Sequence, residues 1–169
     1  RCVESERAME RRARQEQELG PYVRRCEFAI QKAREARKSA PPDYQGWREF
    51  VREGIRAIDE ALAKDDTWTT GYLARGRAKA EGNDLDGAIA DFSLALERNP
   101  HESLARYERG NAYLLKSLIE SPKGPHELRQ ASDRVAGWLR RAVEDFDAGA
   151  REGWKLEKEE AEVVQVYEF

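Results

Sequence analysis

The sequence predicts an all-α protein built as a short solenoid of helix-turn-helix units, with an extended second hairpin and irregular capping helices. The first observation is a repeat, in which Gly76 recurs as Gly110 and Ala61 recurs as Ala95 at the same interval. The second is that apolar residues recur at three- and four-residue spacings, as on one face of a helix. The interval is the period of about 34 residues that is typical of stacked helical hairpins, each of which buries its apolar face against a neighbour.

Composition supports this fold class. Charged residues make up 37% of the 169 residues and apolar ones 40%, which together with long periodic segments indicates exposed helices rather than disorder. The net charge of −3 gives no strong attraction to nucleic acids or membranes, and there is no apolar run long enough to span a bilayer. Cys2 and Cys26 lack a CxxC spacing, so a disulfide framework or zinc site is not indicated and a reducing, cytoplasmic location fits best.

The N-terminal residues 1–20 are expected to form a charged helical arm or linker, because Arg and Glu alternate there with few apolar groups. The Gly20-Pro21 pair is expected to break or kink this helix. Residues 21–169 then form the solenoid domain. Since the chain opens at Arg1 without a methionine, we expect it to be a segment of a longer protein.

A degenerate repeat is predicted at about residues 22–66. Its first helix begins at Tyr22 and ends before Pro41-Pro42, because the residue before a proline is disfavoured in the α region. Its second helix runs from Tyr44 to about Lys64, with Asp43 as the N-cap.

The best repeat is predicted at residues 67–100. A first helix extends to about Glu81, the chain turns at residues 82–84, and Asn83 or Asp84 caps a second helix that ends near Pro100.

An expanded repeat follows at residues 101–152. Its first helix does not turn where the preceding one does but continues through Leu114 and Leu118. The second helix returns late, because the interval from Phe92 to Phe146 exceeds the repeat period by about 20 residues, which indicates an insertion in the hairpin. Residues 153–169 are predicted to form a C-terminal capping helix, although their β-branched content would also suit a strand.

The insertion carries an apolar run at Leu115, Leu118 and Ile119. This run could offer a surface to a partner or to self-association. The sequence favours the alternative, in which apolar residues of the returning helix, such as Val135 and Trp138, cover it.

Residues 69–100 resemble the tetratricopeptide repeat family. The residues that match the family pattern are Tyr72, Gly76, Ala88, Phe92, Ala95 and Pro100. In that pattern the glycine and alanine allow close helix crossings, and the aromatic residue fills the gap between repeats. Arg75 departs from it, because the family has a leucine before the glycine.

The resemblance implies a scaffold in which the first helix of each unit lines a concave groove that binds a peptide or helix of another protein. The residues that map onto this groove are Leu73, Arg77, Tyr107, Asn111 and Leu114. Arg77 could hold a partner carboxylate and Asn111 a peptide backbone. The sequence leaves open that Leu73 and Tyr107 pack between helices and that Arg77 pairs with a nearby Glu.

The expected function is therefore a non-enzymatic protein-protein interaction module without cofactor or metal, with self-association possible. The alternative is a regulatory or substrate-docking segment of a larger enzyme such as a bacterial Ser/Thr protein kinase, which the excess of arginine over lysine would suit. His101 and His126 each follow a proline and fit helix starts better than metal ligands. Nucleic-acid binding by the N-terminal arginines is disfavoured, because Glu residues are interleaved with them.

Overall fold

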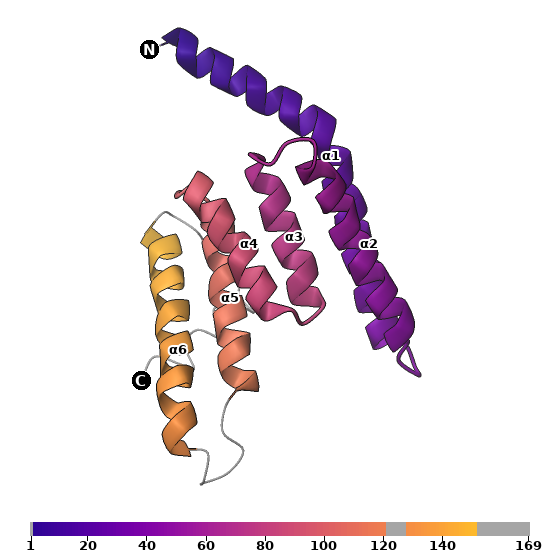
Figure 1. Cartoon of the computed structure of the whole chain (residues 1–169), viewed down its shortest axis with the longest axis vertical. Coiled ribbons are helices and arrows are strands. Elements are labelled where there is room, and N and C mark those ends of the chain that lie inside the picture. The colour runs from indigo at the N-terminus through magenta and orange to yellow at the C-terminus, as the bar shows by residue number, and fades with distance from the viewer. Residues whose placement is uncertain (1, 121–127, 152–169) are drawn as a thin grey trace. The chain divides into compact units, whose positions relative to one another are not determined.

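The computed structural model describes residues 2–120 and 128–151, and this part of the chain is all-α, as predicted (Figure 1). Its helices are α1 (Cys2–Lys38), α2 (Tyr44–Leu62), α3 (Thr69–Glu81), α4 (Leu85–Arg98), α5 (Ser103–Ile119) and α6 (Leu128–Arg151). The chain divides into two compact units, Arg1–Pro100 and His101–Phe169, and each is described by itself. The predicted C-terminal cap at residues 153–169 lies outside the described residues.

Helix α1 is continuous through Pro21, so a break in the helix, one of the two expected outcomes, is wrong. The helix instead changes direction along its length (Figure 1), as expected where a proline removes a backbone donor. The turn before the proline is held by packing, because Leu19 is buried against Ala61 and Trp68. The arm and the first hairpin therefore share one helix.

Helices α1 and α2 form a hairpin. The predicted start of its first helix at Tyr22 is wrong, because α1 begins at Cys2, whereas the predicted start of α2 at Tyr44 is confirmed. The Asp43 carboxylate accepts a hydrogen bond from the Gly46 amide at 2.8 Å and caps α2. A Cβ atom placed on Gly54 would lie 3.5 Å from both Cys26 Sγ and Ala29 Cβ. Small residues therefore bring the two helices into close contact.

The hairpin of α3 and α4 also has the predicted turn and cap. Asn83 has a φ of 63°, in the left-handed region that favours a tight helix-to-helix turn. The Asp84 carboxylate then accepts from the Gly87 amide at 3.0 Å. Helix α3 packs against α1 and α2 as well as α4, an arrangement that is compatible with helical repeats.

In the second unit, α5 and α6 pack around a small core of Leu114, Ala142 and Phe146. The expectation that α6 covers the apolar run on α5 is wrong for three residues. Leu115, Leu118 and Ile119 are 47%, 50% and 54% exposed. The α6 indole that was expected to cover them, that of Trp138, stacks instead on the Tyr113 ring at a centroid distance of 5.8 Å.

Candidate partner-binding surface

The five residues predicted to bind a partner lie on two helices, one in each unit. Leu73 and Arg77 belong to α3, while Tyr107, Asn111 and Leu114 belong to α5. The structure brings each set together along its own helix. Partner binding by the five as one site stays a prediction.

On α3, Arg77 is the accessible member of its pair. Leu73 is only 8% exposed and is therefore mainly a packing residue. The Arg77 side chain keeps 37% of its surface exposed, and its Nη1 lies 3.8 Å from Glu27 Oε1 of α1. This is the pairing with a glutamate that the sequence left open. At that distance the contact between Arg77 and Glu27 is a weak ion pair.

A second charged contact joins α1 to the end of α3. The Glu81 carboxylate is almost buried, and it accepts from Arg34 Nε at 2.8 Å and lies 3.4 Å from Arg37 Nη2. The two arginine side chains stay about half exposed. A guanidinium has five donors, so both arginines keep N–H groups that face solvent. With Arg77, these residues form what we name the α1–α3 arginine face: Arg34, Arg37 and Arg77.

On α5, two of the three predicted residues contribute to packing. Leu114 is buried in the core with α6, and the Tyr107 ring lies 6.2 Å from that of Phe146, centroid to centroid. Asn111 is partly exposed. The exposed Leu115 and Leu118 lie on the same face as Asn111, at four and seven residues along the helix.

The α3–α4 and α5–α6 hairpins each contain a buried ion pair that the sequence reasoning missed. The Arg75 guanidinium donates from Nε and Nη2 to both carboxylate oxygens of Asp91, at 2.9 and 2.7 Å. In the second unit, Arg109 donates to both oxygens of Asp145 in the same way, at 2.7 and 2.6 Å. The two arginines recur at the same interval as the two repeat glycines, since each directly precedes the glycine of its repeat. The departure at Arg75 is thus itself repeated.

The surroundings of this pair explain its chemistry. Asp91 is 1% exposed, and Lys79 Nζ adds a further contact at 2.8 Å. The hydrogen bonds to Asp91 raise the pKa of Arg75 above its ordinary value, although burial alone would lower it. The hydrogen bond to Asp145 likewise raises the pKa of Arg109. Both arginines therefore stay charged and fix one helix of a hairpin against the other.

The pair could have been found from the sequence. Arg-Gly recurs at residues 75–76 and 109–110, and Asp-Phe recurs at residues 91–92 and 145–146. The apolar periodicity predicts the contact between the glycine and the phenylalanine, but it does not indicate that the charged residue before each of them is also paired.

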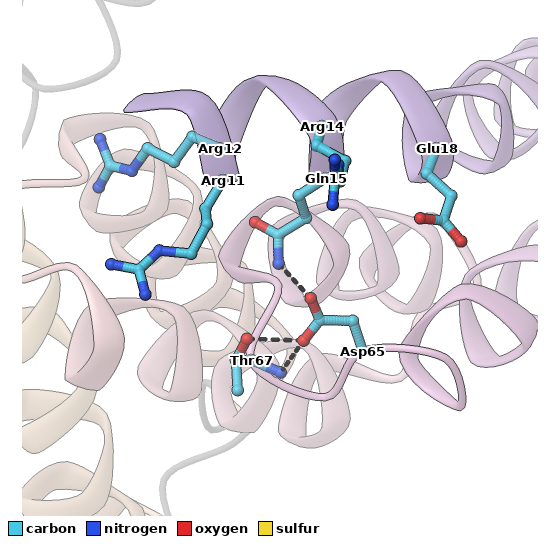
Figure 2. Close-up of a pocket in the computed structure, with 7 residues that line it drawn as sticks. All are labelled: Arg11, Arg12, Arg14, Gln15, Glu18, Asp65 and Thr67. Atoms are coloured by element: carbon cyan, nitrogen blue, oxygen red, sulfur yellow. Dashed lines mark hydrogen bonds between the residues drawn. The ribbon is translucent and has the colours of Figure 1, made fainter. Parts of the chain in front are cut away.

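The N-terminal arm borders an open pocket of about 480 Å³ beside the loop between α2 and α3 (Figure 2). Gln15 donates to the Asp65 carboxylate, which also accepts from the amide and hydroxyl of Thr67. The Thr67 hydroxyl is the main cause of a lowered pKa at Asp65, and Gln15 adds to it. The side chains of Arg11 and Arg12 extend to one side of this contact (Figure 2). The pocket is thus a polar contact that holds part of the arm, with a basic rim.

Cys26 is buried, and burial raises the pKa of its thiol to about 12, so it is a weak nucleophile at neutral pH. In the part of the chain that the structure describes, no group of three or more His, Cys, Asp or Glu side chains is placed to hold a metal ion. Within the same residues, no helix combines the length and apolar character needed to cross a membrane.

No protein-family model matches the chain, and no curated protein matches it.

Proposed function

We propose that this chain is a tetratricopeptide-type interaction module, without enzymatic activity of its own, that binds a segment of another protein. The observation that carries the proposal is the recurrence of one set of contacts in two hairpins. A Cβ on Gly76 would lie 2.5 Å from the Phe92 ring, and one on Gly110 would lie 2.7 Å from the Phe146 ring. Two hairpins with the same contacts at the same repeat positions support a helical-repeat scaffold.

The α1–α3 arginine face supports an acidic segment as the ligand. The buried Glu81 carboxylate accepts from Arg34 and lies beside Arg37, so it restricts the Arg34 guanidinium before a partner binds. Arg77 Nη1 lies 3.8 Å from Glu27 Oε1, and the Arg77 side chain is 37% exposed. Guanidinium groups oriented by a carboxylate of their own chain favour carboxylates of a partner chain. In the second unit, Asn111 of α5 is a separate candidate for hydrogen bonds to a peptide backbone.

A capture experiment tests the proposal. The variant Arg77→Glu with Asn111→Ala should lose a partner that the natural chain retains in affinity purification with quantitative mass spectrometry. Its helicity and melting temperature should not change, because both side chains are at least partly exposed.

Arg56→Glu is the matched control, since Arg56 is an exposed arginine of α2, whereas the arginine face belongs to α1 and α3. The control should keep the partner. Equal capture by the double variant and the natural chain would contradict the proposed binding face.

A further inference from the structure

The loop between α2 and α3 carries a surface hydroxyl next to the N-terminal arm. Thr67 is exposed and lies outside the helices, whereas Thr69 and Thr70 belong to α3 and are half-buried. The Thr67 hydroxyl donates to Asp65 Oδ1 at 2.6 Å, and the Thr67 amide donates to the same oxygen at 2.9 Å. The hydroxyl is therefore accessible to a modifying enzyme, and a change at its oxygen alters this contact.

Three arginines of the arm line the same pocket as Thr67 (Figure 2). All three are exposed, and within the residues that the structure describes none of them forms an ion pair with a carboxylate. Two carboxylates also line the pocket, so its charged side chains carry one more positive charge than negative. These side chains are Arg11, Arg12, Arg14, Glu18 and Asp65. The three guanidinium groups are thus available to an anion that is added beside them.

The start of α3 favours a negative charge at the same place. Trp68 occupies the N-cap position of α3 and makes no side-chain hydrogen bond to the first turn. The amides of a first helical turn carry a positive partial charge, which stabilises an anion nearby. Thr67 directly precedes Trp68, so a charge on the Thr67 side chain lies beside this turn. The arm and the helix therefore favour the same addition.

We propose that Thr67 is a phosphorylation site and that its phosphate docks on the arginines of the N-terminal arm. A protein kinase supplies the phosphoryl group from a nucleoside triphosphate. Thr67 Oγ1 forms the new bond to the γ-phosphorus, and the bond from that phosphorus to the bridging oxygen breaks. The nucleoside diphosphate leaves with the electron pair of that bond, and the hydroxyl proton passes to a base of the kinase.

The modification replaces one contact of the loop by another. Phosphothreonine has no hydroxyl donor and carries a charge of about −1.5 to −2, so it no longer bonds to the Asp65 carboxylate and is repelled by it. Rotation of the side chain to another staggered position moves the phosphate toward the arginines, which bind phosphate by paired charge-assisted hydrogen bonds. Both groups belong to one chain, so a modest attraction is sufficient for docking. The phosphate then ties the arm to the loop.

This site goes beyond the proposed function, because it uses the arm and the loop and leaves the α1–α3 arginine face to another protein. The two proposals fail separately. Arg77→Glu should alter partner capture and leave the docked phosphate unchanged. Arg11→Gln with Arg14→Gln should release the phosphate from the arm.

Phosphorus NMR of a chain with phosphothreonine built in at position 67 tests the docking. The second pKa of a free phosphothreonine is about 6. In the folded chain it should be lower by about 0.5–1, because guanidinium groups favour the dianion, and high salt should reduce the difference. Amide hydrogen exchange of residues 7–15 should also slow several-fold relative to the unmodified chain.

Two double variants separate docking from a general effect of charge. Arg11→Gln with Arg14→Gln should return both the pKa and the exchange to their undocked values. Arg48→Gln with Arg52→Gln is the matched control, since these are two exposed arginines of α2 beside a different pocket, and it should change neither. A pKa equal to that of the same phosphorylated chain in urea, or equal effects of the two double variants, would overturn the docking.

Phosphopeptide mass spectrometry tests whether the site is used. The chain purified from growing and from starved cells of the organism that encodes it should carry phosphate at Thr67. Thr67→Ser should keep the modification, and Thr67→Val should lose it. A chain with phosphate only at other hydroxyls, or with none, would overturn the modification whatever the docking measurement gives.

Discussion

Replacing Gly76 by alanine should destabilise the first unit, although alanine is the better helix former. Gly76 lies inside α3, and its missing side chain leaves room for the Phe92 ring. An added Cβ would lie 2.5, 2.8 and 3.0 Å from three atoms of that ring, which is closer than such contacts allow. Phe92 is completely buried, so the ring cannot move into solvent to relieve the contact.

Two opposing effects set the magnitude. Alanine in place of glycine inside a helix contributes about 1 kcal/mol. Overpacking a filled core costs about 1–3 kcal/mol, and a ring fixed on all sides lies toward the upper end of that range. The net loss for Gly76→Ala is therefore about 1–2 kcal/mol. Gly110→Ala should lose less, because its Cβ would lie 2.7 Å from a Phe146 ring that is 8% exposed.

Gly137→Ala is the internal control, because a Cβ on Gly137 in α6 would meet nothing within 4 Å. It should gain about 0.5–1 kcal/mol from helix propensity alone. Urea unfolding followed by circular dichroism in the far ultraviolet measures all three variants. Equal stabilisation by Gly76→Ala and Gly137→Ala would contradict the predicted clash with the Phe92 ring. Adding Phe92→Leu to Gly76→Ala should recover part of the loss, a coupling that only contacting residues show.

Two further predictions use the buried polar groups. Arg75→Ala should cost about 3 kcal/mol, because it leaves the Asp91 carboxylate buried with Lys79 as the cation that remains in contact with it. Arg75→Met with Asp91→Leu should cost less, because it leaves no buried charge unpaired. Urea unfolding measures both free energies. The raised pKa of Cys26 predicts a loss of stability at alkaline pH. The free energy of unfolding should be unaffected by the thiol below pH 9, its ordinary pKa, and should fall as the pH rises toward 12. Between these values only the unfolded chain releases the thiol proton. The slope is at most about 1.4 kcal/mol per pH unit, and Cys26→Ala should remove this part of the alkaline loss; an identical pH profile for the variant would rule out the thiol as its source.

The helices and their caps were predictable because they depend on local chemistry. Prolines end α1 near Lys38, and Asp43 and Asp84 accept bonds from amides three residues later, as their spacing indicates. The continuity of α1 through Pro21 was not predictable from local rules, because it depends on the packing of Leu19 against Ala61 and Trp68, which are distant in the sequence. Exposure along α5 was not predictable either. The aromatic side chain that could have covered its leucines stacks on Tyr113, and only the three-dimensional contact decides that.

The repeated ion pair explains how two hairpins of different length keep the same contacts. Arg75 and Asp91 are separated by 16 positions, whereas Arg109 and Asp145 are separated by 36, so the inserted segment lies between the bonded groups. Closing the longer segment costs only about 0.7 kcal/mol more, because loop entropy grows with the logarithm of length. Breaking the buried bidentate pair, or removing the phenylalanine that packs against the glycine, costs several times that amount. The contacts therefore determine the helix pairing, and the chain between them is free to lengthen without changing it.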